Sequence, residues 1–375
     1  MSRLDELYQD LYNKRQRFIG YPVNQSFDYS ALFRFLDFSF NNYGDPFYDS
    51  NYSLNTHSIE RTVVSTFAKL LGTDPNETWG YVTSGTTESH IFSLQAARDT
   101  FPDGIVYFST STHSSIGKAV RLLRMAHVVV QSLDDGEIDY RALECEIGFH
   151  LDKPALIVVN IGTTMTGAID SLPRVCAILD RIGVPGRYIH ADAALSGMIL
   201  PFVDSPQPFQ FTDGLDSVAI SGHKMIGSPL PCGVVLARRM YVTHLQQNGE
   251  VEYVRCMDTT VASSRSAFAP LILYHALRMH GVLDDEDELG DCVSMKAMVE
   301  KALDMSEYAV VMMNRGNIPA WRHQNSLTVV FPRPTVQLER KWSLAATNNI
   351  AHMMVMPGIS MEQIENLISD LCEER

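Results

Sequence analysis

The chain has 375 residues, of which 45% are apolar and 20% charged, an ordinary globular composition that excludes extended disorder. Its formal net charge of −14 argues against nucleic acid or an anionic membrane as a general partner, although a local anion site needs only a few donors. The charged N-terminus and the lack of any apolar run of 18 residues predict neither a signal peptide nor a membrane span. The six cysteines form no CxxC pair, which favours reduced thiols in a cytoplasmic protein over a metal site or a disulfide framework.

Between residues 79 and 237, short apolar runs alternate with longer amphipathic stretches, a pattern typical of an α/β domain with a largely parallel sheet. We predict strands over residues 79–83, 105–108, 127–132, 155–161, 188–191, 217–220 and 233–237. We predict helices over residues 86–99, 115–125, 140–150 and 172–182. The expected fold is therefore α/β, with a mainly parallel sheet of these seven strands.

The pattern changes after residue 245. Helices are predicted over residues 269–281, 294–315 and 361–372, and one strand over residues 326–331. We expect an N-terminal arm (residues 1–55), a large domain (56–245), and a mobile loop followed by a small C-terminal α/β domain (246–375). The arm is rich in Tyr, Phe and Asn, which suits packing on a partner subunit as well as a plain surface arm.

The segment Ser221-Gly222-His223-Lys224 follows the strand predicted at residues 217–220 and precedes a second glycine, Gly227. A lysine amine becomes a nucleophile toward aldehydes when burial or nearby positive charge lowers its pKa. The two glycines leave room for a flat ligand beside Lys224. Taken alone, however, a lysine is usually a solvated surface charge.

Asp192 ends the apolar strand at residues 188–191 and is followed by Ala193 and Ala194. A buried carboxylate is costly without a cationic partner, and the protonated nitrogen of a pyridine ring is such a partner. Holding that nitrogen protonated makes the ring an electron sink. The competing interpretation of Asp192 is a helix N-cap for the segment that follows.

Residues 83–88, Thr-Ser-Gly-Thr-Thr-Glu, join a predicted strand to a predicted helix. Backbone N–H groups at a helix N-terminus bind phosphate when hydroxyl groups lie beside them, although the same residues also fit an ordinary capping box. His113 lies between a strand and a helix, on the side where open α/β sheets bind ligands. An imidazole there can stack on an aromatic cofactor, although a lone loop histidine is more often inert.

These four features come in the order phosphate loop, histidine, acid and lysine, each after a predicted strand. Asp192 and Lys224 are 32 positions apart (224 − 192), which leaves room for one further strand, so both can reach one pocket. The chain has no G-x-G-x-x-G motif, P-loop or G-x-S-x-G elbow. The combination indicates an enzyme that carries pyridoxal 5′-phosphate (PLP) as a Schiff base on Lys224 and decarboxylates a small amino acid.

On these residues the sequence resembles the group II PLP-dependent amino-acid decarboxylases, which have the aspartate-aminotransferase fold (PLP fold type I), and among them the bacterial PLP-dependent histidine decarboxylases. The similar stretches begin at Asn160 (NIGTTMTGAID), His190 (HADAALSGMILPFVD), Ser221 (SGHKMIGSPLPCG) and Ala320 (AWRHQNSLTVVFP). The likeness spans about residues 18 to 375. The SGHK and HADAA segments are typical of the superfamily, whereas LSGMILPFVD points to the histidine branch.

The resemblance implies a role for each matching residue of the cofactor site. Lys224 would carry the cofactor, Asp192 would pair with its ring nitrogen, and Ala194 and His113 would pack on its two faces. His113 would also touch the substrate, and Thr164 would lie near the ring hydroxyl group. The residues that would surround the phosphate are Gly85, Thr86, Thr87, Ser221 and His223.

The resemblance also implies a homodimer with shared active sites, a small amino acid as substrate, and histamine and carbon dioxide as the products from L-histidine. Tyr253, in a segment similar to the family's mobile loop, would deliver a proton, either in its own site or in that of a partner subunit. In the arm, Tyr21, Pro22 and Tyr43 are candidates for reading the substrate side chain.

Three short segments depart from the family pattern. The family usually has Gly-Gly-Thr-Glu-Gly-Asn where residues 85–90 read GTTESH. The histidine branch usually has Ser-Arg-Asn-Gly-His where residues 264–268 read SRSAF, and His-Tyr-Ser where residues 113–115 read HSS. The first change should preserve phosphate binding, because Thr86 adds a hydroxyl group. The other two lie on the expected substrate side and leave other amino acids open as substrates.

Three other functions remain alternatives. An aminotransferase on the same fold typically grips the substrate carboxylate with arginine, which a decarboxylase should avoid because that contact stabilises the ground state. Arg265, Arg322 and Arg333 are the arginines that would distinguish the two. The second alternative is a decarboxylase that yields another amine, or an aldehyde in specialised biosynthesis. The third is a PLP-binding protein without turnover, which the retained Lys224 and Asp192 argue against.

Overall fold

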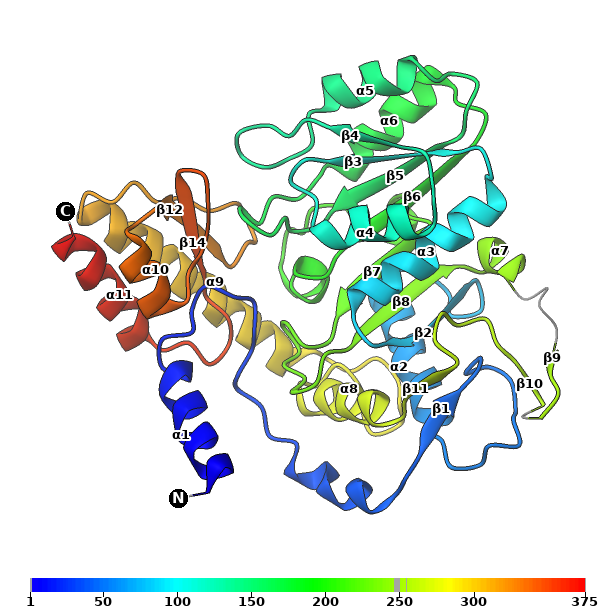
Figure 1. Cartoon of the computed structure of the whole chain (residues 1–375), viewed down its shortest axis with the longest axis horizontal. Coiled ribbons are helices and arrows are strands. Elements are labelled where there is room, and N and C mark those ends of the chain that lie inside the picture. The colour runs from blue at the N-terminus through cyan, green and yellow to red at the C-terminus, as the bar shows by residue number, and fades with distance from the viewer. Residues whose placement is uncertain (1, 246–249, 254, 375) are drawn as a thin grey trace.

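The computed structural model describes residues 2–245, 250–253 and 255–374, and a seven-stranded sheet flanked by helices forms its centre (Figure 1). The strands are β2 (Thr78–Thr83), β3 (Ile105–Ser109), β4 (His127–Val130), β5 (Ala155–Asn160), β6 (Arg187–Asp192), β7 (Ser217–Ser221) and β8 (Gly233–Arg238). Their order across the sheet is β2-β8-β7-β6-β5-β3-β4. Only β8 of these seven runs against the others, since it pairs antiparallel with both β2 and β7. The seven strands predicted from the sequence are the strands of this sheet.

Helices bury both faces of the sheet, which explains the nearly unbroken apolar runs in its strands. Every residue of β2, β3, β5 and β7 is buried, as expected for strands covered on both sides. The surrounding helices are α2 (His57–Leu70), α3 (Thr86–Thr100), α4 (Ser114–Leu122), α5 (Tyr140–Gly148), α6 (Leu172–Ile182), α7 (Arg239–Val242) and α8 (Phe268–Met279). No helix in the described ranges is long and apolar enough to cross a membrane.

Local sequence signals set the ends of these helices. Helix α6 has proline in its first turn and ends at Gly183, whose φ of 72° is left-handed and therefore suits glycine. Helix α5 starts after Asp139, whose carboxylate accepts the backbone N–H groups of Arg141 and Ala142. The helix predicted over residues 115–125 ends at residue 122 instead, because Arg124 turns left-handed with φ of 54°.

The C-terminal part forms a second core around a small antiparallel sheet. Its strands, in the order β12-β14-β13, are β12 (Thr328–Pro332), β14 (Ile350–Met354) and β13 (Ala345–Thr347), and α9 (Val293–Arg315), α10 (Val336–Trp342) and α11 (Met361–Glu373) surround them. The sequence predicted only the first of these strands. The buried residues of this second core are Ile19 and residues that lie between Ala309 and Leu371. Helix α8 packs in the larger core instead. The division near residue 245 stays a prediction.

The N-terminal arm lies along the outside of the large core. Helix α1 (Arg3–Arg15) has no buried residue and stands apart from the sheet (Figure 1). Further along, β1 (Asn41–Tyr43) pairs antiparallel with β11 (Ser264–Ser266). The remaining strands, β9 (Glu250–Val251) and β10 (Cys256–Met257), form a short separate pair.

A buried ion pair joins β11 to the large core. The side chains of Arg265 and Glu60 are 3% and 0% exposed, and the Arg265 guanidinium donates to a Glu60 carboxylate oxygen. Arg265 also donates to the carbonyl of Gly44 at 2.8 Å, while Glu60 accepts the backbone N–H of Val82 at 2.8 Å and the side-chain amide of Asn42 at 2.7 Å. These bonds tie the arm, α2, β2 and β11 together.

Arg265→Met should lower the free energy of unfolding by about 3–5 kcal/mol, because it leaves the Glu60 carboxylate buried without its cation. Urea unfolding followed by tryptophan fluorescence measures this loss. Arg333→Met is the matched control, since Arg333 pairs with Glu339 at the surface and should change stability far less. Equal losses of unfolding free energy in the two variants would show that the buried Arg265–Glu60 pair contributes no more to stability than the surface Arg333–Glu339 pair.

Candidate active site

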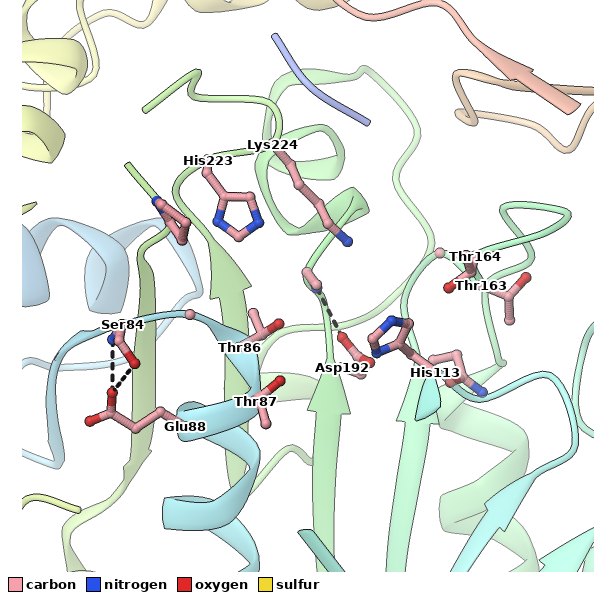
Figure 2. Close-up of a pocket in the computed structure, with 15 residues that line it drawn as sticks. Ser84, Thr86, Thr87, Glu88, His113, Thr163, Thr164, Asp192, His223 and Lys224 are labelled. Carbon is pink, nitrogen blue, oxygen red and sulfur yellow. Dashed lines mark hydrogen bonds between the residues drawn. The ribbon is translucent and has the colours of Figure 1, made fainter. Parts of the chain in front are cut away.

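The carboxyl ends of five strands meet at one edge of the large sheet. Strands β2, β3, β5, β6 and β7 run in the same direction, and a cavity of about 340 Å³ opens where they end. The lining residues are Ser84, Gly85, Thr86, Thr87, Glu88, His113, Asn160, Gly162, Thr163, Thr164, Asp192, Ala194, His223, Lys224 and Pro231. The structure thus brings the predicted lysine, acid, histidine and phosphate loop into one pocket (Figure 2).

Lys224 lies on a loop that the N-terminal arm holds in place. The buried Asn24 donates its backbone N–H to the Lys224 carbonyl at 3.2 Å and its side-chain amide to the Met225 carbonyl at 2.9 Å. Gly227, with φ of 88°, lets the loop turn closely past Asn24, where an added Cβ would lie 3.0 Å from the asparagine side chain. The fixed loop lets the Lys224 side chain point toward Asp192 and His113 (Figure 2).

Burial shifts the pKa of both Lys224 and Asp192, and the charge of each residue counteracts the shift that burial causes in the other. Burial lowers the pKa of Lys224 from its ordinary value, and the carboxylate of Asp192 only partly restores it. Burial also acts to raise the pKa of Asp192, but His90, Lys224 and the backbone N–H of Ala194 outweigh it, so that this pKa is lowered. The site therefore combines an ionised acid with an amine that loses its proton more readily than a surface lysine.

His113 caps helix α4 and exposes its ring in the cavity. The backbone N–H of Ser115 donates to Nδ1 of His113 at 3.3 Å, and the Ser115 hydroxyl lies 2.7 Å from the same nitrogen. With Nδ1 as acceptor, the ring proton belongs on Nε2. Burial lowers the pKa of His113, and the cations of Lys224 and Lys118 add to this against the carboxylate of Asp192. The geometry therefore offers a neutral, flat ring beside Asp192.

The start of helix α3 forms the opposite wall of the cavity. Gly85 precedes the helix with φ of 150°, and the backbone N–H groups of Thr86 and Thr87 are among the first four of the helix, which have no intrahelical acceptor. Glu88 fixes the turn, because its carboxylate accepts the Ser84 backbone N–H at 2.8 Å and the Ser84 hydroxyl at 2.6 Å. Gly85 is the N-cap residue and no side chain caps the helix, so the capping box considered from the sequence is not formed, and the first N–H groups and the threonine hydroxyls are open to an anion.

The other predicted cofactor residues lie around the same loops. His223 contacts the backbone of Cys232 through Nδ1, 2.9 Å from the carbonyl oxygen, and keeps Nε2 available to a ligand. Ser221 is buried outside the lining, and its hydroxyl has no hydrogen-bond partner among the described residues. Ala194 and Thr164 line the cavity beside Asp192.

The four remaining predicted residues do not line this cavity. Tyr253 is 74% exposed, and its hydroxyl donates to that of Tyr43 at 2.7 Å. Tyr21 and Pro22 belong to the arm segment just before Asn24 and also lie outside the lining. Their predicted roles in proton delivery and substrate recognition stay predictions.

Sequence reasoning missed several residues at or beside the site, and two of them, Asn160 and Asn24, position its parts. Asn160 ends β5 and lines the cavity, and its side-chain amide donates to Asp170 at 2.8 Å and to Ser109 at 3.2 Å. A polar residue closing an apolar strand is the signal that identified Asp192, and it applied equally to Asn160. Asn24 gave no such signal, because its contact with the Lys224 loop spans about two hundred residues of chain.

Comparisons with known proteins define the class of enzyme. Residues 47–320 match the family model described as the pyridoxal-dependent decarboxylase conserved domain. That stretch contains the lysine, acid, histidine and phosphate loop described above, and it covers most of the chain. The chain belongs to the pyridoxal-dependent decarboxylase family, whose cofactor is pyridoxal phosphate.

Individual relatives match over nearly their whole length. A histidine decarboxylase of Pseudomonas entomophila is 43% identical over 375 residues, covering 100% of this chain and 89% of the relative. A histidine decarboxylase of Acinetobacter baumannii is 45% identical, covering 96% of this chain and 91% of the relative. Among solved structures, L-methionine decarboxylase from Streptomyces sp. 590 aligns with a TM-score of 0.87 at 25% identity, covering 99% of this chain and 94% of that one. This likeness confirms the predicted fold type.

The cavity residues fit pyridoxal phosphate. An amine, an ionised acid and a helix N-terminus with free N–H groups supply what its aldehyde, ring nitrogen and phosphate require. A Cβ added at Gly85 would meet no atom within 4 Å, so space for a phosphate is open beside the helix start. The hydroxyl of Ser221, which has no hydrogen-bond partner among the described residues, is a further donor close in sequence to Lys224.

The rate at which the protein without cofactor attaches PLP covalently should rise with pH to a half-maximum below 10.5, the ordinary pKa of a lysine. Burial disfavours the cation, so the neutral amine that attacks an aldehyde is populated at lower pH. Borohydride reduction followed by mass spectrometry measures the attachment. In Asp192→Asn the curve should shift to still lower pH, because that carboxylate raises the pKa of Lys224; a shift to higher pH contradicts this reading.

Proposed function

We propose that the chain decarboxylates L-histidine to histamine and carbon dioxide, with pyridoxal 5′-phosphate bound to Lys224. The observation that carries the proposal is the pairing of Lys224 and Asp192 across one cavity at the end of β6 and β7. Histidine as the substrate is supported by the histidine decarboxylases that are 42–45% identical to the chain over nearly its full length.

The chemistry that bound PLP supplies is an electron sink for the pair left on Cα when the carboxylate departs as carbon dioxide. Asp192 stays ionised and holds a proton on the ring nitrogen, which keeps the sink cationic as that charge develops. Lys224 would hold the aldehyde of the cofactor, because its lowered pKa makes the neutral amine available for that bond and for exchange with the substrate amine. His113 and Ala194 line the same cavity and would pack on the two faces of the ring, where the neutral imidazole of His113 would also be near the substrate.

The positions of the arginines favour decarboxylation over transamination. No arginine is among the described residues that line the cavity. Arg265 is committed to Glu60, Arg322 donates to Glu307 at 3.0 Å, and Arg333 donates to Glu339 at 2.6 Å. A substrate carboxylate that is not held by a cation is free to leave, because no ground-state ion pair has to be broken.

We also infer a homodimer in which Tyr253 acts in the partner's site. Tyr253 lies exposed outside the cavity of its own chain, and α1 carries the exposed apolar residues Leu4, Leu7 and Leu11 without burying any residue. Helix faces of this kind are usually covered by another subunit. A cytoplasmic location is consistent with the free thiols, which are those of Cys145, Cys176, Cys232, Cys292 and Cys372.

Incubation of the purified enzyme and PLP with each of the twenty common amino acids should give histamine and carbon dioxide from histidine alone. Lys224→Ala should abolish this turnover, because no amine remains to bind the aldehyde, whereas Lys301→Ala on the exposed face of α9 should keep it. Chromatography of amines, aldehydes and keto acids distinguishes the outcomes. Another amine or an aldehyde would reject histidine as the substrate, and a keto acid would reject decarboxylation.

Mixing Lys224→Ala subunits with Tyr253→Phe subunits should restore activity if Tyr253 serves the partner's site. Random exchange makes half of the dimers hybrid, each with one complete site, so about a quarter of the wild-type activity per subunit should return. Sedimentation gives the oligomeric state, and histamine release gives the activity. If both parents are inactive and the mixture stays inactive, Tyr253 serves its own chain; a monomer would reject the shared site.

A further inference from the structure

Three buried side chains that do not line the cavity form a line that ends at Asp192. His90 lies on α3, His190 on β6 and Ser217 on β7, and all three are 0% exposed. Nδ1 of His90 lies 2.9 Å from Nε2 of His190, and Nδ1 of His190 lies 2.7 Å from the Ser217 hydroxyl. At the other end, Nε2 of His90 lies 3.5 Å from a carboxylate oxygen of Asp192.

Both imidazoles of this line are neutral. Burial, reinforced by the neighbouring His90, lowers the pKa of His190 to about 3. Burial also lowers the pKa of His90, where Lys224 and His113 add to the effect and only Asp192 opposes it. Each ring therefore carries one proton and offers one donor and one acceptor nitrogen.

The carboxylate decides which nitrogen of each ring carries the proton. A lone pair of His90 facing Asp192 would be repelled, so the His90 proton belongs on Nε2 and Nδ1 is an acceptor. Nε2–H of His190 then donates to Nδ1 of His90, and the hydroxyl of Ser217 donates to Nδ1 of His190. All three donors point the same way, toward Asp192.

The last donor of the line has no partner within the described chain. Nε2 of His90 is buried and makes no hydrogen bond there, and a buried N–H without an acceptor costs free energy. Asp192 is the acceptor within reach, and its other carboxylate oxygen already accepts the Ala194 backbone N–H at 3.2 Å. A closer approach of the two side chains than the present 3.5 Å would complete the bond.

We propose that His90 is a positioning residue for the cofactor: its Nε2–H, fixed by His190 and Ser217, donates to Asp192 and keeps that carboxylate ionised and aimed at the ring nitrogen. The inference rests on the proposed role of Asp192 opposite that nitrogen. A carboxylate that loses this donor becomes a stronger base and takes the shared proton from the ring.

Two substitutions separate the contact with Asp192 from the contact with His190. His90→Gln places an amide nitrogen near the position of Nε2, whereas His90→Asn places its terminal atoms near Nδ1. We expect His90→Gln to keep cofactor affinity within a few-fold of the wild type. His90→Asn and His90→Leu should weaken PLP binding by about tenfold to a hundredfold, the range that a hydrogen bond to an ionised group supplies.

The direct readout is the ¹⁵N chemical shift of PLP labelled at the ring nitrogen and bound to each enzyme. The wild type and His90→Gln should show a protonated nitrogen, whereas His90→Asn and His90→Leu should shift toward the unprotonated value. The value of kcat should fall with the loss of protonation, while KM changes less. Urea unfolding confirms that each variant is folded, and His57→Gln, at a buried histidine of α2, is the matched control.

The outcomes separate the inference from the proposed function. If the wild-type nitrogen is itself unprotonated, the proposed role of Asp192 fails. If the wild-type nitrogen is protonated and folded His90→Leu retains both that signal and wild-type affinity, Asp192 keeps its role and the positioning role of His90 is rejected. A loss in His90→Gln as large as in His90→Leu also rejects it, because the donor at the Nε2 position would then be irrelevant.

Discussion

The electrostatic interaction between Lys224 and Asp192 is the constraint on which the rest of the site depends. Burial drives each group toward its neutral form, and the charge of each opposes that effect in the other. The balance leaves an ionised acid and an amine with a lowered pKa facing one cavity. A flat ring with an aldehyde at one end and a basic nitrogen at the other satisfies both, since it takes the amine as a covalent partner and gives the acid a new cation.

The sheet makes this pairing possible at small conformational cost. Strands β6 and β7 are parallel neighbours, and Asp192 pairs with Ala219, two residues before β7 ends. Consequently, the acid lies on a rigid strand end while the lysine lies on the adjoining loop. Asn24 then fixes that loop from the N-terminal arm, so a residue far away in sequence restrains the direction in which the amine points.

The sequence predicted the large sheet and the centre of the site because their signals are local. Short apolar runs identified all seven strands, including the antiparallel β8 and the more exposed β4, and a polar residue at the end of such a run identified Asp192. The line from His90 to Ser217 gave no comparable signal, since its three members lie on α3, β6 and β7 and meet only through tertiary packing. The same holds for Asn24. Likewise, β13 has only three residues, too few for a periodic pattern, and β14 pairs with it across a turn at Asn348.

Charged and hydrogen-bonding groups are concentrated around Asp192, whereas the described lining offers no arginine to a substrate carboxylate. This distribution suits a decarboxylation. Around Asp192, the structure gathers a backbone N–H and a line of buried side chains, which in our proposal act together on the proton of the ring nitrogen. The described lining contains no arginine to hold the substrate carboxylate, and Arg265 is committed to a buried partner instead. A reaction that expels a carboxylate gains from strong stabilisation where charge arrives and weak stabilisation where charge departs. This distribution of charge therefore favours loss of carbon dioxide over reactions that retain the carboxylate.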